Sequence, residues 1–167
     1  MWHRSMPSHD LAHGWAGSMT LPRKLSLKDG RLVQELPESV KDHFLVENAP
    51  ETIVKGNQIT IPARGKQTLF EIGAKSGRSF ILSYGNESDA DSALQLIYDA
   101  FNKRFSLSRD QFGYLISGKE SPEIQSRWIQ LDGEKDHHFS ILRDTNSIEV
   151  FVDGKTLSMT FYETTEN

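Results

Sequence analysis

Short apolar runs separated by turn residues extend over most of this 167-residue chain, and they restrict it to a β-rich fold. Two of the turns are Asp-Gly pairs, Asp29-Gly30 and Asp153-Gly154, and each stands between two strand-like runs. A two-residue type I′ turn needs a positive φ at both central positions, and for this reason it prefers such pairs. The pattern therefore predicts one β-hairpin within residues 24–34 and another within residues 147–162.

Further runs have the length and the period-2 alternation of half-buried strands. In residues 103–109, for example, Phe105 and Leu107 fall on one face. The remaining strand-like runs cover residues 67–73, 78–84, 93–99, 127–131 and 138–142. Many short strands at this spacing predict an all-β fold: an antiparallel two-sheet β-sandwich, jelly-roll or concanavalin-like, with about a dozen strands.

Helical signals are few. The best candidate runs from Pro37 to Phe44, where Pro suits the first helical position but only about two turns fit. Residues 88–92, which are acidic and small, add at most one further turn. No repeat of fixed period is present, and this disfavours a complete propeller.

Composition argues against several classes of function. A net charge of -4 offers no basic face for nucleic acid, and no apolar run approaches the roughly 20 residues of a membrane span. Residues 1–13 lack the apolar region of a signal peptide, and without Cys there are no disulfides, thiolate nucleophiles or Cys-based zinc sites. We therefore expect a cytoplasmic protein with neither a nucleic-acid nor a membrane partner.

The segment from Gly14 to Leu25 is composed differently from the rest of the chain and reads Gly-Trp-Ala-Gly-Ser-Met-Thr-Leu-Pro-Arg-Lys-Leu. It resembles the segment that leads out of the catalytic propeller in glycoside hydrolase family 32, which includes invertases, levanases and sucrose-6-phosphate hydrolases. The residues that carry this domain-junction motif are Trp15, Gly17, Pro22 and Arg23. Lys24 stands where the family usually has Glu, so one carboxylate is absent from the junction.

A second block, Asp144 to Val152, reads Asp-Thr-Asn-Ser-Ile-Glu-Val-Phe-Val. It is similar to the Asp-x-Ser-x-Ile-Glu-Val-Phe strand near the end of the C-terminal β-sandwich of the same family. The two blocks lie at opposite ends of the chain, in the order and at about the separation of the family. The resemblance implies that residues 1–30 are a remnant of the last propeller strand with a linker, and that residues 31–167 are the C-terminal β-sandwich domain.

The motifs that supply the family's catalytic carboxylates are absent from this chain. Retaining glycosidases use two carboxylates about 5–5.5 Å apart, and in this family they come from Asn-Asp-Pro-Asn-Gly, Arg-Asp-Pro and Glu-Cys. Asp110 is followed by Gln111 and Asp144 by Thr145, so neither Arg-Asp pair is Arg-Asp-Pro. We expect no catalytic residue here and no hydrolysis by this polypeptide alone.

The histidines do not predict a metal site. His3, His9 and His13 stand in a segment without helical periodicity, and Asp10 is the only evident supporting carboxylate. His137 and His138 are adjacent, so on a strand they point to opposite faces. We expect neither a metal nor a cofactor.

The three tryptophans, Trp2, Trp15 and Trp128, could offer flat apolar faces to sugar rings. Trp2 and Trp128 are the candidates for carbohydrate contact. Packing in the core or in an interface is the competing interpretation, and we favour it for each Trp.

Three functions remain open. The favoured one is a non-catalytic module that packs on the catalytic propeller of a β-fructofuranosidase-type hydrolase of sucrose, sucrose-6-phosphate or fructan, and stabilises it. The alternatives are a carbohydrate-binding module for fructans or related sugars, and a separately encoded remnant without activity. An uncovered junction predicts that this surface binds the propeller or self-associates, most simply as a two-fold dimer.

Overall fold

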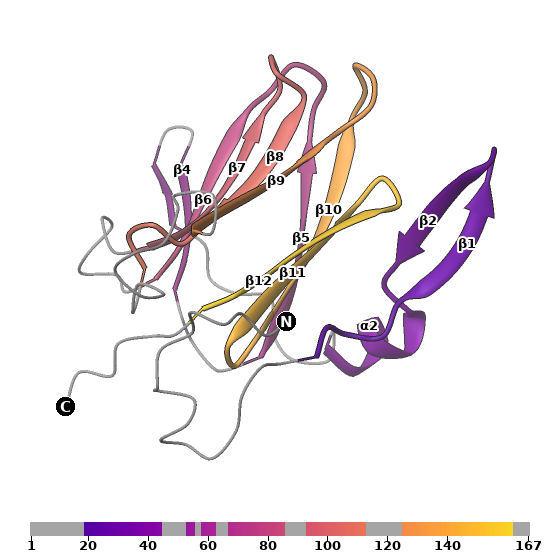
Figure 1. Cartoon of the computed structure of the whole chain (residues 1–167). Helices are drawn as coiled ribbons and strands as arrows, with labels where there is room; N and C mark the ends of the chain where they lie inside the picture. The colour runs from indigo at the N-terminus through magenta and orange to yellow at the C-terminus, as the bar shows by residue number, and fades with distance from the viewer. Residues whose placement is uncertain are drawn as a thin grey trace.

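The computed structural model describes residues 19–44, 53–55, 58–62, 67–85, 93–112 and 125–161. Within these residues the chain forms two facing sheets and a separate hairpin with a short helix (Figure 1). The hairpin consists of β1 (Lys24–Lys28) and β2 (Arg31–Glu35), and α2 (Glu38–Phe44) follows it. β1 and β2 belong to neither of the larger sheets.

The four-stranded sheet has the order β12-β11-β10-β5, and all its pairs are antiparallel. Its strands are β5 (Thr68–Ala74), β10 (His137–Asp144), β11 (Ser147–Val152) and β12 (Lys155–Thr160). The six-stranded sheet has the order β3-β4-β6-β7-β8-β9. Its strands are β3 (Ile53–Lys55), β4 (Gln58–Pro62), β6 (Phe80–Gly85), β7 (Ala93–Asp99), β8 (Arg104–Ser108) and β9 (Ser126–Gln130).

The main core fills the space between the two sheets. Phe105 and Leu107 of β8 are fully buried there, as their alternation predicts, and they meet Phe139 and Ile141 of β10 in one hydrophobic cluster. The aromatic rings of Phe105 and Phe139 lie 5.0 Å apart between centroids. The predicted β-sandwich is thus confirmed.

Both Asp-Gly hairpins are confirmed. Asp29 and Gly30 have φ values of 51° and 73°, and Asp153 and Gly154 have 52° and 73°. These are the paired left-handed conformations of a type I′ turn. The turns join β1 to β2 and β11 to β12, whose strands pair antiparallel in register.

One strand pair departs from the antiparallel arrangement of the sandwich: β4 and β6 pair in parallel. β5 lies between these strands in sequence but belongs to the opposite sheet. The chain therefore crosses to the other sheet and returns, which lets β6 run in the direction of β4. No tight hairpin joins the two strands, so turn chemistry does not impose an antiparallel pairing.

The helix forms where Pro37 to Phe44 predicts it, with a shift at its start. α2 begins at Glu38, and the Pro37 carbonyl accepts hydrogen bonds from the amides of Val40 and Lys41. Pro37 therefore precedes the helix rather than occupying its first position. No helix in the described part of the chain is long and apolar enough to span a membrane.

The four-stranded sheet is covered on both faces. A second hydrophobic cluster on its outer face joins Leu142 and Phe151 to Leu36, with Val40 and Phe44 of α2 packed against it. β11 therefore loses the alternation of exposed and buried residues that a half-buried strand shows. Through this second cluster, Leu21 and α2 pack against the outer face of the four-stranded sheet.

Candidate docking interface

The two sequence blocks that resemble family 32 meet in space. Arg23 of the first block lies 3.1 Å from Glu149 of the second, measured from Nη2 to Oε2. The backbone amide of Leu21 donates a hydrogen bond to the other carboxylate oxygen of Glu149. Residues separated by more than 120 positions thus form one polar joint.

Glu149 is almost completely buried, whereas the Arg23 side chain is about a quarter exposed. A buried carboxylate is costly unless it is paired and hydrogen-bonded. Here Arg23 supplies the charge, and the Ser158 hydroxyl lies 3.1 Å from the same oxygen. Arg23 also donates to Ser158 and, through Nη1, to the side-chain oxygen of Gln34 in β2. The joint therefore ties the incoming segment, the hairpin and the four-stranded sheet together.

The hairpin itself presents apolar side chains to solvent. Leu25, Leu27 and Leu32 are each more than half exposed, and Leu27 lies directly across from Leu32 in the register. Met19, just ahead of the hairpin, is 93% exposed. We call these four residues the junction face.

Contacts with the β11–β12 turn hold the hairpin against the sandwich. The amide of Gln34 donates to the Gly154 carbonyl at 2.8 Å. A Cβ added to Gly154 would lie 2.8 Å from a methyl carbon of Val33, so the backbone of the turn and this side chain are closely packed. The absence of a side chain at residue 154 is therefore needed both for the positive φ and for this approach.

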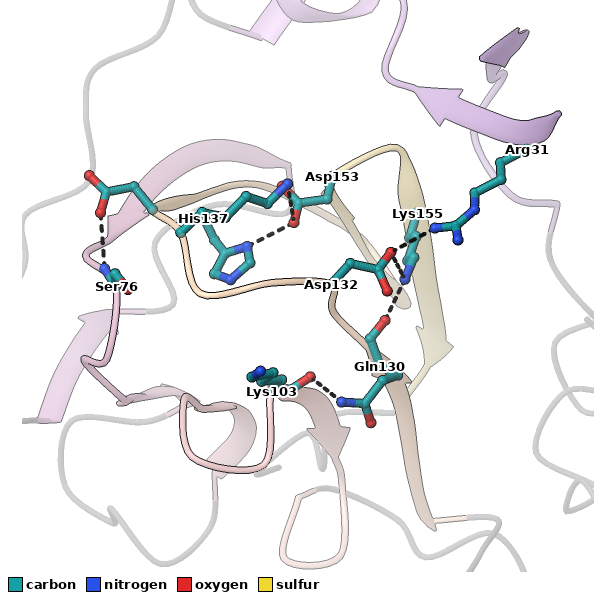
Figure 2. A network of polar contacts seen from close by, with 10 residues as sticks. Arg31, Ser76, Lys103, Gln130, Asp132, His137, Asp153 and Lys155 are labelled. Carbon is teal, nitrogen blue, oxygen red and sulfur yellow. Dashed lines mark hydrogen bonds and ion pairs between the residues drawn. The ribbon is translucent and has the colours of Figure 1, made fainter. Parts of the chain in front are cut away.

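A polar network at the same end adds further attachments (Figure 2). Asp132, in the connection from β9 to β10, accepts from Lys155 Nζ at 3.0 Å and lies 3.5 Å from Arg31, the first residue of β2. The hydrogen bond from Lys155 holds the pKa of Asp132 below its ordinary value of 3.8, and the positive charges of Lys155 and Arg31 act in the same direction. Lys155 also donates to the Gln130 carbonyl at 2.6 Å.

The β9–β10 connection is tied to the β5–β6 turn as well. Asp136 accepts from Lys75 Nζ at 2.6 Å and from the Ser76 amide at 2.9 Å. These hydrogen bonds hold the pKa of Asp136 below 3.8, and the same bond raises the pKa of Lys75 above 10.5. Because both side chains are largely exposed, solvent screening limits what this pair contributes to stability.

His137 and His138 point to opposite faces of β10, as predicted. His137 is buried, and its Nδ1 lies 2.7 Å from Asp153 Oδ2 (Figure 2), while the His138 side chain is 63% exposed. Burial, followed by the negative charge of Asp153, raises the pKa of the nearby Tyr98 hydroxyl above 10.0. Among the described residues no group of three potential metal ligands gathers. His3, His9 and His13 lie outside them.

A cavity of about 250 Å³ lies between the hairpin with α2 and the outer face of the four-stranded sheet. Charged groups supply much of its wall, including Lys24 and Glu35, whose side chains lie 3.6 Å apart. Lys24, where the resemblance implies Glu, thus pairs with a carboxylate across the hairpin. The lining residues are Lys24, Gln34, Glu35, Leu36, Glu38, Lys41, His138, Ser140, Phe151, Val152, Asp153 and Gly154.

Trp128 lies apart from this region, on β9 of the six-stranded sheet. It is 53% exposed, and the Arg104 guanidinium lies 4.4 Å from the centroid of its ring. Packing of Trp128 in the core of this chain, one of the two favoured interpretations, is therefore wrong. The inward positions of β9 belong to its neighbours in the alternation, of which Ile129 packs against the main core.

Of the sequence-predicted site residues, Arg23 bonds Glu149 and Pro22 directly precedes it, whereas Trp128 lies on the six-stranded sheet. Trp2, Trp15 and Gly17 fall outside the described residues. The sequence does not mark Glu149 as a site residue, although it stands inside the second block. A buried strand that carries one acidic residue was the available signal, because such a residue needs a cationic partner.

Comparison with known proteins identifies the family. The model described as "Glycosyl hydrolases family 32 C terminal" matches residues 33–167. The chain belongs to this family. Its match begins within β2, so the hairpin straddles the start of the family's C-terminal region.

The similar curated proteins are sucrose-6-phosphate hydrolases from two strains of Zymomonas mobilis subsp. mobilis. They are 30% and 27% identical to this chain, and each match covers 91% of the chain. The same matches cover 29% of each relative, so this chain spans less than a third of their length.

Solved structures show the same fold. The sucrose-6-phosphate hydrolase of Lactobacillus gasseri matches with a TM-score of 0.63 at 18% identity, over 87% of this chain and 29% of that one. An exo-inulinase from Aspergillus awamori matches with a TM-score of 0.61 at 16% identity, over 90% of this chain and 31% of that one. At these identities the likeness concerns the fold alone.

Proposed function

We propose that this chain is a non-catalytic module that packs on the catalytic propeller of a β-fructofuranosidase-type hydrolase and stabilises it. Membership of the family 32 C-terminal domains supports this role. The relatives named above suggest sucrose, sucrose-6-phosphate or a fructan as substrate of the whole enzyme. The cytoplasmic location expected from the sequence stays a prediction.

The junction face carries the proposal. Its three leucines are exposed on the hairpin and Met19 is exposed just ahead of it, and the hairpin is held against the sandwich by Arg23 and by the β11–β12 turn. Contiguous exposed apolar side chains on an ordered element commonly mark a protein–protein contact. We assign the whole hairpin, residues 24–35, to the contact with the propeller. A domain boundary between residues 30 and 31 would fall inside its turn.

Co-elution tests the proposal. We expect the full 167-residue chain to form a complex with the propeller part of a family 32 sucrose-6-phosphate hydrolase and to raise its melting temperature. Leu27→Asp should abolish the complex because a carboxylate would be buried without a partner. Ile81→Asp, on the six-stranded sheet, is the matched control and should bind as the wild type does. Failure of the wild-type chain to co-elute or to stabilise the propeller would contradict the role.

Without a propeller, the junction face would bind a second copy of this chain. A two-fold dimer is the simplest closed arrangement, because it covers the same surface on both subunits. We expect light scattering at high protein concentration to show a dimer for the wild type and a monomer for Leu27→Asp. A wild-type monomer under these conditions would refute self-association.

The purified chain should not hydrolyse sucrose, because its sequence contains none of the three carboxylate motifs expected for such chemistry. The check is glucose or fructose release from sucrose, sucrose-6-phosphate and inulin. Robust turnover by the chain alone would show that a different pair of carboxylates acts.

A second function, binding of carbohydrate, is favoured by one observation: Trp128 is exposed although large apolar side chains on its sheet are otherwise mostly buried. An aromatic ring open to solvent can stack on the apolar face of a sugar ring. Trp2 stays a candidate on sequence grounds alone.

A further inference from the structure

The exposed large apolar side chains of the described residues fall into two groups. Four of them form the junction face. The other three belong to the six-stranded sheet and its turns: Ile81 on β6, Phe101 in the β7–β8 turn and Trp128 on β9. Packing against a propeller through the hairpin accounts for the first group and leaves the second without a role.

The strand register places Trp128 in a continuous row. Ile81 pairs with Ile97, Ile97 with Ser106, and Ser106 with Trp128, so these four residues cross β6, β7, β8 and β9 on one face. Their neighbours in the alternation, such as Leu82, Leu96 and Phe105, fill the main core. The row therefore lies on the face directed away from the core, and three strand spacings of about 4.8 Å make it long enough for several ligand atoms.

The shape of the row follows from its side chains. Ser106 is small, and its hydroxyl lies 3.5 Å from the Ile97 carbonyl of the neighbouring strand, so it keeps close to the sheet. Trp128 rises beside it with the Arg104 guanidinium against its ring. A cation held over an aromatic face restrains the orientation of the ring. Trp128 is thus an aromatic side chain of restrained orientation beside a position, Ser106, whose small side chain leaves the surface of the sheet open.

Polar side chains flank the row on both sides. On one side the register aligns Gln95 with Ser108 and Ser108 with Ser126. On the other it aligns Asp99 with Arg104 and Arg104 with Gln130. Hydroxyl and amide groups both donate and accept hydrogen bonds, which suits a ligand that carries many hydroxyl groups.

Charge and composition distinguish between ligand classes. The two ionised side chains in these rows, Asp99 and Arg104, have opposite signs and lie opposite each other, so this part of the face has no net charge. Such a surface gives an anionic ligand no net electrostatic attraction. Serine is depleted at protein–protein interfaces. This face of the sheet carries three serines: Ser106, Ser108 and Ser126. Both features favour a neutral polyhydroxylated ligand over a protein.

We propose that the Trp128 row on the outer face of the six-stranded sheet binds an uncharged oligosaccharide, with the indole ring stacked on a sugar ring and the flanking rows bonded to its hydroxyl groups. The proposal rests on the second function above, carbohydrate binding, and locates that binding on the six-stranded sheet. It is independent of docking through the junction face, because the two surfaces share no residue and lie on different elements.

Titration of the full chain with levan, inulin and a neutral glucan, and with polygalacturonate as an anionic probe, tests the site. We expect binding to at least one neutral polysaccharide, about tenfold weaker in Trp128→Ala. Trp128→Tyr should retain most of the affinity because it keeps a stacking ring. Leu27→Ala, on the junction face, is the matched control and should bind as the wild type does, and circular dichroism checks the fold of each variant.

Absence of binding to every neutral polysaccharide would overturn the proposal, and so would binding that Trp128→Ala leaves unchanged. Equal binding of polygalacturonate would contradict the neutral specificity. If Trp128→Ala instead weakened the complex with the propeller, the row would be a protein contact and the sugar site would be wrong. Loss of propeller binding in Leu27→Asp with sugar binding intact would leave both proposals standing.

Discussion

At the scale of single residues, Glu149 determines how the chain is joined together. Its strand is buried on both faces, and its carboxylate is bonded by Arg23, Ser158 and the Leu21 amide. The family resemblance pointed to both blocks, but neither block by itself predicts their contact. Sequence alone gives no register between segments this far apart, because pairing depends on how the intervening strands stack.

Arg23→Met should lower the free energy of unfolding by about 3 kcal/mol, because it leaves the buried Glu149 carboxylate without its charge partner. Glu149→Gln combined with Arg23→Met should recover part of the loss, since the remaining amide needs no counter-charge. Urea denaturation of the two single variants and the double variant measures the coupling. Additive effects of the two substitutions would show that the pair does not act as a unit.

Acid should weaken the polar network around the β9–β10 connection. The folded-state pKa of Asp136 lies below its unfolded value of 3.8, because Lys75 and the Ser76 amide bond the carboxylate. Its contribution is therefore complete above about pH 4 and is lost as the pH falls through the lowered pKa. Asp136→Asn should reduce the urea midpoint at neutral pH and show a smaller further decrease at about pH 3 than the wild type. If the urea midpoints of the wild type and of Asp136→Asn fell equally in acid, the Asp136 carboxylate would not contribute to the acid sensitivity.

Trp128 shows where residue-level prediction from the sequence stopped. Its two neighbours in sequence, Arg127 and Ile129, are plausible on either face of the sheet. The sequence therefore does not decide which side chains of this strand point into the core. Phe105 and Leu107 were predictable because polar residues alternate with them. In β9 the inward position next to Ile129 goes to the half-buried Arg127, whose guanidinium donates to the Ser158 carbonyl.

At the scale of elements, turn chemistry was predictable and sheet membership was not. Asp29-Gly30 and Asp153-Gly154 form the hairpins that their sequences indicate. The strand at residues 68–74, by contrast, leaves its sequence neighbours and pairs with β10. A local signal specifies a turn, whereas the choice of sheet depends on packing across the whole core. The same limit explains the parallel pairing of β4 and β6.

Two glycines with the same φ of 73° allow the hairpin contact to be measured. Gly30→Ala should lower the free energy of unfolding by about 1 kcal/mol, because an alanine disfavours the left-handed conformation. Its Cβ would meet no other atom within 4 Å. Gly154→Ala should cost clearly more, since its Cβ would also press on Val33 and loosen the hairpin from the sandwich. Urea denaturation compares the pair, and equal losses would mean that the approach of Val33 to the turn adds nothing.

At the scale of the whole molecule, the chain presents two unlike surfaces on opposite parts of the fold. The junction face lies on and just ahead of the β1–β2 hairpin, whereas the Trp128 row crosses β6, β7, β8 and β9 of the six-stranded sheet. The hairpin and this sheet are separate elements (Figure 1). The sequence predicted a sandwich and an exposed junction. It also predicted the hairpin within residues 24–34, but not the ion pair between Arg23 and the buried Glu149 that ties the segment ahead of this hairpin to the sandwich.

The most direct test of docking through the hairpin is amide hydrogen exchange of this chain with and without the catalytic propeller of a family 32 hydrolase. The account predicts that the propeller slows exchange within residues 19–35 and leaves the amides of β7, β8 and β9 unchanged. Slowing confined to β7–β9, or no slowing in the hairpin within a stable complex, would contradict it.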